Sequence, residues 1–254
     1  IPMTFKTHIN KKGIASVCLS RPPVNALDSH GWNALASEIN KLSDDKIVRV
    51  LVLHAKGKGF CAGVDIKELA DDASRISEVN KGCYESFKSL RSCAVPVIAA
   101  IHGFCLGGGI GLAGSSDIII ASEDAYFGLP EIDRGALGAA SHLARMFPLQ
   151  HVRRMMFTAE PISSAEAYRL GALESVVTKE ELMDSAMKLA EKIAQKSSIA
   201  VRLAKESLNV IEPHDVDESY LLEQDYTLKL YESEDSTEAR KAFIEGREAK
   251  FKSK

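Results

Sequence analysis

The first half of the chain alternates between short apolar runs and segments with helical periodicity. Residues 14–19 and 48–54 are rich in β-branched and aliphatic side chains, which predicts two strands. Between them, apolar residues recur every three or four positions, as on one face of an amphipathic helix. The residues of this helix face are Trp32, Leu35, Ile39 and Leu42.

Two further apolar runs follow the same plan. Residues 95–101 come after a polar segment with a helical stripe around Phe87, and residues 117–121 come after a glycine-rich stretch. Strands that are separated by helices imply right-handed crossover connections. We therefore predict an α/β fold with a largely parallel sheet.

The last third of the chain has helical periodicity throughout. The clearest segments are residues 179–194, 199–210 and 215–248, with interruptions at Pro213 and at the acidic run that begins at Glu232. We expect a core over residues 1–195 and a C-terminal helical region over residues 196–254.

The composition is that of an ordinary globular protein. Of 254 residues, 45% are hydrophobic and 26% are charged, and the formal net charge is -3. This balance gives no general basic field for nucleic acid or an anionic membrane, so neither is an expected partner. The first residues show no arginine-rich or long apolar leader, and no apolar run reaches the roughly 18 residues of a membrane span. The expected location is therefore cytoplasmic.

The five cysteines lack the spacing of a metal site. They form no Cys-x-x-Cys pair and no zinc-ligand pattern with histidines. We expect reduced, buried thiols rather than a catalytic cysteine, and no metal.

Two glycine-rich segments each follow a predicted strand. Residues 57–67 read Gly-Lys-Gly-Phe-Cys-Ala-Gly-Val-Asp-Ile-Lys, and residues 103–112 read Gly-Phe-Cys-Leu-Gly-Gly-Gly-Ile-Gly-Leu. Glycine lets the main chain turn sharply and approach a ligand, and a helix that starts there has free N–H groups. A plain strand-to-helix turn is the alternative for the first segment. The second segment is neither a phosphate-binding loop nor a dinucleotide fingerprint, because the residues required after its glycines are missing.

A third segment sets carboxylates among apolar residues. Residues 125–135 contain Glu131 and Asp133 close to Phe127. Burial by apolar neighbours raises the pKa of a carboxyl group and suits it to proton transfer near neutrality. The alternative is a surface cluster in which these carboxylates pair with Arg134.

Together the three segments resemble the crotonase (enoyl-CoA hydratase/isomerase) superfamily, and the resemblance extends from residue 21 to residue 251. It implies a ClpP-like spiral of ββα units with a C-terminal helical trimerisation region, and a homotrimer or hexamer. It also implies an acyl-CoA substrate, with coenzyme A as part of the substrate and no separate cofactor.

The resemblance implies roles for particular residues. The N–H groups of Val64 and Gly108 would form an oxyanion hole for the thioester oxygen, where rigid donors stabilise an enolate. The other residues that the resemblance places around the substrate are Phe60, Ala62, Asp65, Ile66, Gly107, Lys250 and Phe251. Lys250 and Phe251 resemble residues that close over the CoA of the same or a neighbouring subunit.

The chain departs from the hydratases of this superfamily at two places. Hydratases use two glutamates; the second is present as Glu131, but the first position holds Gly111, which cannot transfer a proton. Beyond Glu131, a shorter stretch at residues 135–143 replaces the usual glycine-rich loop. With these departures, the chain is most similar to the steroid ring-opening acyl-CoA hydrolases of the superfamily.

That similarity implies hydrolytic C–C cleavage, a retro-Dieckmann reaction, of a cyclic β-keto acyl-CoA. A carboxylate-activated water adds to the ring ketone, and the leaving thioester enolate is stabilised in the oxyanion hole. Glu131 is the first candidate for the base, followed by Asp133 and Asp65. Arg134 and His142 are candidates for binding a substrate carboxylate or ketone, with structural roles as the alternative.

Two other functions stay open. One is an enoyl-CoA hydratase or Δ3-Δ2-enoyl-CoA isomerase that works with Glu131 alone, since moving a double bond needs a single base. The other is a scaffold that binds acyl-CoA or RNA without turnover. The near-neutral charge and the presence of Glu131 argue against the scaffold.

Overall fold

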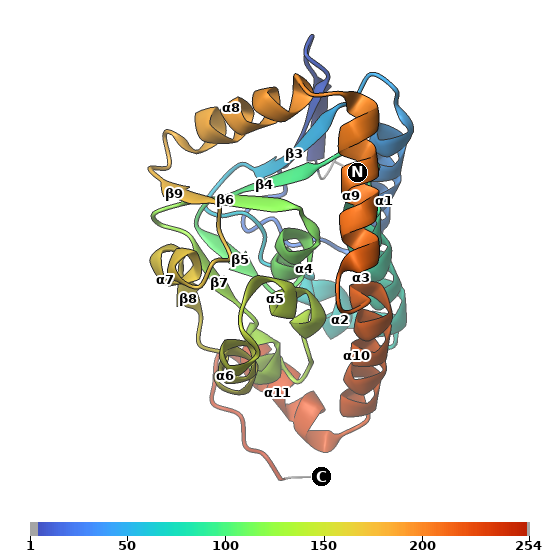
Figure 1. Ribbon diagram of the computed structural model, residues 1–254. Helices are drawn as coiled ribbons and strands as arrows, with labels where there is room; N and C mark the ends of the chain where they lie inside the picture. Colours follow the sequence, from blue (N-terminus) through green and yellow to red (C-terminus); the bar gives the residue numbers. More distant parts are fainter. Residues whose placement is uncertain (1–4, 253–254) are drawn as a thin grey trace.

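The computed structural model describes residues 5–252, so the outermost residues of the two predicted regions, 1–4 and 253–254, lie outside the described part. Strands and helices alternate as the apolar pattern predicts (Figure 1). In chain order the elements are β1 (Phe5–Ile9), β2 (Ile14–Leu19), α1 (Ser29–Asp44), β3 (Val50–Ala55), α2 (Ile66–Asp71), η1 (Ala73–Arg75), α3 (Ile76–Arg91), β4 (Val97–Ile101), β5 (Phe104–Leu106), α4 (Gly108–Ser115), β6 (Ile118–Ser122), β7 (Tyr126–Gly128), η2 (Pro130–Arg134), α5 (Ala140–Met146), α6 (Leu149–Thr158), β8 (Ile162–Ser163), α7 (Ser164–Arg169), β9 (Ser175–Val177), α8 (Leu182–Ala194), α9 (Ser198–Ile211), α10 (Val216–Tyr231) and α11 (Glu234–Glu245).

A six-stranded sheet with the strand order β1-β2-β3-β4-β6-β9 forms the centre of the fold. β1 is antiparallel to β2, and every other neighbouring pair in this sheet is parallel. The prediction of a largely parallel sheet is therefore confirmed. All five residues of β4 are buried, because a parallel strand is covered on both faces and reads as a continuous apolar run.

Helices cover both faces of this sheet. On one face, α8 packs across β3, β4 and β6 (Figure 1). Its Ala186 belongs to one buried apolar cluster with sheet residues that include Val52 and Ile98. On the other face, alternate residues of the same strands join the main core with α1, α3 and α4. Trp32 of α1 and Phe87 of α3 are among the largest side chains buried there.

A second, three-stranded sheet with the order β5-β7-β8 carries the two segments of chemical interest. β5 and β7 are parallel, and Leu106 pairs with Gly128 at their ends. β5 leads directly into α4 and β7 leads directly into η2. The triple glycine and the Glu131 segment therefore leave the same edge of one sheet side by side.

In Figure 1 the C-terminal helices α9 and α10 run down the right side of the molecule, and α11 lies at the bottom. α10 packs against α3 and α5, and α11 packs against η2. α9 is anchored by the buried Lys205, whose Nζ donates to Asp117 Oδ2 at 2.8 Å and to the carbonyl oxygens of Leu90 and Val95. Of the helices within residues 5–252, none combines the length and the hydropathy that crossing a bilayer demands.

Candidate active site

The turn that follows β3 is fixed on both sides of Val64. Leu27 N donates to Gly63 O at 2.9 Å, and Asp65 N donates to Leu27 O at 2.8 Å. These two bonds use the groups on either side and leave the Val64 N–H without a backbone partner among residues 5–252. A main-chain donor that is held rigidly and left unpaired is suited to a ligand oxygen.

The second turn starts α4. Gly107 is the N-cap residue, with φ 56° and ψ -116°, a conformation that side chains disfavour. Its N–H donates to Gly128 O at 3.1 Å and so ties the turn to the end of β7. Gly108 is the first residue of the helix, and the first N–H groups of a helix have no partner within it.

The two turns touch without any side chain between them. A Cβ added to Gly63 would lie 2.8 Å from Gly108 N, and one added to Gly108 would lie 3.2 Å from Gly63 Cα. Val64 and Gly108 line the same inner cavity. The geometry thus brings both candidate donors to one small region, as the oxyanion-hole hypothesis requires.

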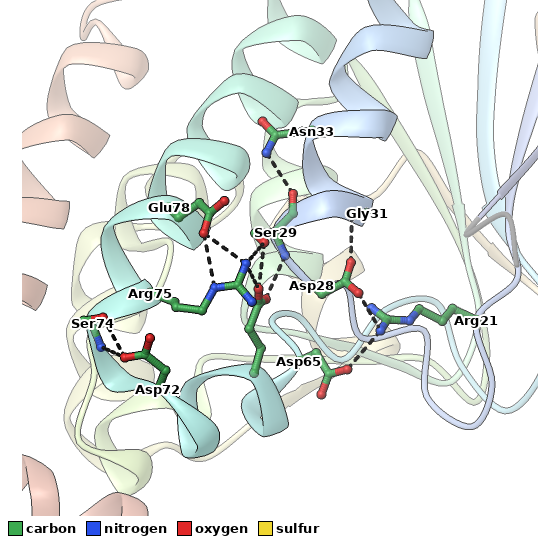
Figure 2. A network of polar contacts seen from close by, with 11 residues as sticks. Arg21, Asp28, Ser29, Gly31, Asn33, Asp65, Asp72, Ser74, Arg75 and Glu78 are labelled. Atoms are coloured by element: carbon green, nitrogen blue, oxygen red, sulfur yellow. Dashed lines mark hydrogen bonds and ion pairs between the residues drawn. The ribbon is translucent and has the colours of Figure 1, made fainter. Parts of the chain in front are cut away.

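Ion pairs hold the Val64 turn in place (Figure 2). Arg21 bonds to Asp28 at 2.9 Å and to Asp65 at 3.1 Å. Asp28 caps α1 through Gly31 N, and Asp65 caps α2 through Lys67 N. The Asp65 carboxylate is therefore engaged in anchoring the turn, although the residue also lines the groove described below.

A second group of ion pairs continues the network along the helix starts (Figure 2). Arg75 pairs with Glu68 at 2.9 Å and with Glu78 at 3.0 Å. Glu68 in turn accepts hydrogen bonds from the N–H and the hydroxyl of Ser29. The starts of α1, α2 and α3 are thus tied together around the Val64 turn.

An inner cavity and an outer groove meet at this turn. Both are lined by Ala62, Val64, Ile66 and Arg134, so they adjoin at these residues. The cavity extends between α3, α10 and the Glu131 segment, whereas the groove runs past Phe104 toward α11. A long ligand could lie in the groove with its reactive end beside Val64 and Gly108.

Glu131 is enclosed between two glycines. A Cβ on Gly107 would overlap its Oε1 atom, and one on Gly138 would lie 2.6 Å from its Oε2 atom. Oε2 is buried and has no hydrogen-bond partner among the described residues. Burial raises the pKa of Glu131 to about 7, against the opposing effects of its own backbone N–H and of Arg134.

The pKa of Glu131 suits a general base that works near neutral pH. The alternative of a surface cluster does not describe this segment, because no ion pair within residues 5–252 joins Arg134 to Glu131 or Asp133. Arg134 instead stacks over the ring of Phe243 at 4.5 Å, at the junction of cavity and groove. Its guanidinium is available to a ligand.

Phe87 fills the space that a side chain at position 111 would need. A Cβ on Gly111 would overlap the Phe87 ring. This ring makes edge contacts with Trp32 at 5.6 Å and with His142 at 4.9 Å, and it lies 5.3 Å from Tyr220. The aromatic cluster leaves no room for a second catalytic carboxylate at this place.

We expect Gly111→Glu to destabilise the protein by about 3 kcal/mol or more, because it overpacks the core and buries a carboxylate. It should not create a crotonyl-CoA hydratase. Urea unfolding and a crotonyl-CoA assay test this, with Ser77→Glu, an exposed change in α3, as the matched control. A stable Gly111→Glu protein that hydrates crotonyl-CoA would contradict this description of the site.

Three residues expected near the substrate lie elsewhere. Phe60 is fully buried in the main core, and Asp133 is exposed on η2. His142 has no exposed surface, its ring nitrogens have no partner among the described residues, and burial lowers its pKa to about 3. It packs between Phe87 and Tyr220 at the base of the site. None of the three lines the cavity or the groove.

The C-terminal residues Lys250 and Phe251 are exposed and line neither the cavity nor the groove within this chain. Lys250 N donates to Glu238 Oε1 at 2.9 Å. Phe243 and Ile244 of α11 line the groove instead. The remaining candidates, Ala62, Val64, Asp65, Ile66, Gly108, Glu131 and Arg134, line the cavity or the groove, and Gly107 lies against Glu131.

Sequence reasoning missed the polar residues that the helices bring to the cavity. They are Asn80 of α3, Tyr220, Thr227 and Tyr231 of α10, and Arg240 of α11. A signal did exist, because polar side chains recur at positions 220, 224, 227 and 231, the spacing of one helix face. A buried helix face made of polar residues indicates a lined cavity rather than a plain core.

Glu223 of α10 fixes the opposite wall of the cavity. Its carboxylate accepts hydrogen bonds from Ala140 N at 2.7 Å, Ser141 N at 3.0 Å and Ser141 Oγ at 2.9 Å. These bonds engage two of the N–H groups at the start of α5. The loop at residues 135–139, four of which line the cavity, is thereby held between Glu131 and α5.

The cysteines are free and buried, as expected. Burial raises the pKa of Cys61 to about 12, which keeps this thiol protonated. Within the described part of the chain, no group of three or more His, Cys, Asp or Glu side chains is placed to hold a metal ion.

The sequence pattern of the enoyl-CoA hydratase/isomerase family matches residues 9–254. A (7aS)-7a-methyl-1,5-dioxo-2,3,5,6,7,7a-hexahydro-1H-indene-carboxyl-CoA hydrolase of Rhodococcus jostii (strain RHA1) is 46% identical over 235 residues, which cover 92% of this chain and 91% of the relative. The protein of the same name from Mycobacterium tuberculosis (strain ATCC 25618 / H37Rv) is 44% identical over 246 residues, with 96% and 99% covered.

The crystal structure of a carnitinyl-CoA hydratase from Mycobacterium avium has a TM-score of 0.87 at 24% identity and covers 100% of both chains. At this identity the likeness concerns the fold, and it confirms the expected crotonase fold class.

Proposed function

Because the chain belongs to the enoyl-CoA hydratase/isomerase family, we propose that it holds an acyl-CoA thioester oxygen between the N–H groups of Val64 and Gly108 and hydrolyses a C–C bond in a cyclic β-keto acyl group. The two hydrolase relatives support this choice, since the substrate in their name carries two ring ketones and a CoA thioester. It also agrees with the sequence resemblance to steroid ring-opening hydrolases.

The observation that carries the proposal is that an aromatic ring occupies the space that a side chain at position 111 would need. Phe87 occupies the space beside Gly111, and Glu131 is the only carboxylate among the described residues that line the inner cavity. Hydration by the usual pair of glutamates is therefore excluded, because the described lining of the cavity contains no second glutamate. One base in a partly apolar cavity is sufficient to activate a single water.

The reaction proceeds in three steps. Glu131 takes a proton from water as the water oxygen bonds to the ring ketone carbon. The C–C bond between that carbon and the thioester α-carbon then breaks, and its electron pair forms the thioester enolate. Val64 and Gly108 stabilise the enolate oxygen, which carries the developing charge. Glu131 returns its proton to the α-carbon, so the sum is substrate plus one water.

The groove supplies the path for the CoA moiety. Ala62, Ile66 and Asp65 form its wall beside the hole, and Lys67 is exposed along it. Arg134 at the junction is placed for an oxygen of the pantetheine or acyl portion. Gly107 serves by leaving space for the Glu131 carboxylate.

Assembly as a homotrimer or hexamer is part of the proposal. α9 exposes several large apolar side chains: Ile199, Leu203, Leu208, Val210 and Ile211. Apolar side chains exposed in such number on one helix favour burial against another subunit. Light scattering during size exclusion should give three or six times the mass of the chain, and a monomer at micromolar concentration would contradict this part.

The function is tested with CoA thioesters of cyclic β-ketones in ordinary and in 18O-labelled water. Mass spectrometry should show a product heavier than the substrate by one water, with the label in the new carboxyl group. Crotonyl-CoA should be hydrated slowly or not at all. Rapid crotonyl-CoA hydration without ring opening would overturn the proposal. If none of these CoA thioesters is converted, the scaffold alternative is favoured.

The second candidate is an enoyl-CoA isomerase that uses Glu131 alone. The same observation favours it, because a single base that removes and returns one proton is all that the shift of a double bond requires. Conversion of trans-3-hexenoyl-CoA to the 2-isomer, in the absence of ring opening, would establish this function instead.

A further inference from the structure

Arg240 of α11 is a cation of the inner cavity to which the sequence analysis gave no role. Its guanidinium carbon lies 4.1 Å from the centre of the Tyr231 ring, and its N–H groups donate to Ser236 Oγ and, at 3.2 Å, to Thr237 Oγ1. The ring and the two hydroxyls fix the plane of the guanidinium. A guanidinium has five N–H donors, so several remain for a ligand.

No carboxylate within residues 5–252 forms an ion pair with Arg240. Arg247 of the same region, by comparison, is exposed and forms ion pairs with Glu238 and Glu245 at 2.6 Å each. Arg240 is half-buried, where an unpaired charge is more costly than at the surface. An anionic ligand would supply the missing partner.

The charge of the inner cavity also favours an anionic ligand. Its charged lining residues, within the described chain, are Glu131, Arg134 and Arg240. One carboxylate therefore faces two guanidiniums, and the balance becomes more positive whenever Glu131 is protonated. Arg134 also lines the groove, whereas Arg240 lines only the cavity and so serves the acyl end of a ligand.

Arg240 and Glu131 belong to one connected unit. Ser236, which accepts a hydrogen bond from Arg240, donates its own hydroxyl to Gly135 O. Gly135 is the C-cap of η2, the short helix that carries Glu131. The packing of α11 on η2 therefore fixes the guanidinium relative to the catalytic carboxylate.

We propose that Arg240 binds the acyl oxygen that becomes the new carboxylate, and so forms a second anion site within the cavity. This rests on the proposed ring opening. When water adds to the ring ketone, the ketone oxygen gains negative charge, and after the C–C bond breaks the same oxygen belongs to a carboxyl group. That group loses its proton to solvent and pairs with Arg240 in a bidentate manner.

The chemical class of preferred ligands follows from this site. They are cyclic acyl-CoAs that carry a ketone oxygen on the carbon β to the thioester, and products that carry a free carboxylate at the end of the opened chain. Linear mono-CoA thioesters of dicarboxylic acids, from succinyl-CoA to suberyl-CoA, imitate such a product without any reaction.

Calorimetric binding of these thioesters, each against the monocarboxylic acyl-CoA of equal length, tests the site. At one chain length the wild-type protein should prefer the dicarboxylic ligand by about 10- to 100-fold. Arg240→Met should bring this preference close to unity, and Arg240→Lys should retain part of it. Arg153→Met, which removes an exposed charge on α6, is the matched control and should keep the full preference.

Absence of a preference at every length, or a preference that Arg240→Met leaves unchanged, overturns the proposal, as does a preference that disappears only in Arg134→Met. Circular dichroism checks the fold of each variant, and Arg240→Lys carries the test if Arg240→Met does not fold. If the protein opens the ring but its preference for dicarboxylic ligands does not depend on Arg240, only the Arg240 site is rejected and the proposed function stands. A preference that depends on Arg240, in a protein without ring opening, supports the site and rejects the proposed function.

Discussion

Replacing Glu131 with glutamine should lower kcat for ring opening by about 100- to 10,000-fold, the range typical of the loss of a general base. Glutamine has nearly the same shape and fits between Gly107 and Gly138, but it cannot take a proton from water. The affinity for the CoA thioester should change little, because Val64, Gly108 and the groove are untouched. Steady-state kinetics and calorimetric binding measure the two quantities separately.

The pH profile gives an independent test of the same residue. Burial raises the pKa of Glu131 to about 7, and a base must be deprotonated to act. The value of kcat/KM should therefore rise with pH up to about 7 and then level off. Asp133→Asn should leave this profile in place, since Asp133 is exposed outside the cavity. Loss of activity in Asp133→Asn with full activity in Glu131→Gln would contradict the assignment.

Gly63→Ala should reduce kcat by about 100- to 1,000-fold, as the loss of an oxyanion-hole donor does in other enzymes. The added Cβ would lie 2.8 Å from Gly108 N and obstruct its N–H. The backbone at Gly63 has φ 91°, so alanine also strains the turn that carries Val64. Both donors are disturbed by one methyl group.

Gly171→Ala is the control that separates strain from chemistry. Gly171 has φ 83° and open space around its Cα, so alanine there costs a similar strain but touches nothing. We expect Gly171→Ala to lose about 1–2 kcal/mol of stability in urea unfolding. Gly63→Ala should lose more, because its Cβ also meets the backbone of Gly108, and only Gly63→Ala should lose turnover. Equal kcat values for the two variants would contradict the role of the Gly63 turn.

The sheet could be predicted because its strands are covered on both faces and read as continuous apolar runs. The Trp32 stripe revealed α1 for a similar reason, since every residue of that stripe faces the core. These signals are local in the sequence. The glycine turns were also visible locally, but their meeting was implied only by the resemblance to the crotonase superfamily.

Contacts between distant segments could not be predicted from a pattern. That Phe87 fills the space beside Gly111, and that Arg240 reaches the cavity of Glu131, depends on how α3 and α11 pack. The resemblance placed Phe60 at the substrate, and His142 was a candidate for binding a substrate carboxylate or ketone, but both rings are buried in the protein. An aromatic ring next to a functional turn has the same sequence signal whether it faces the ligand or the core.

The central claim is that two main-chain N–H groups share one thioester oxygen. A crystal structure of the Glu131→Gln protein with a cyclic β-keto acyl-CoA tests it most directly. The account predicts the thioester oxygen at about 2.7–3.1 Å from both Val64 N and Gly108 N, with the ring in the inner cavity. A bound thioester whose oxygen contacts neither N–H group, or that lies outside the cavity, would contradict it.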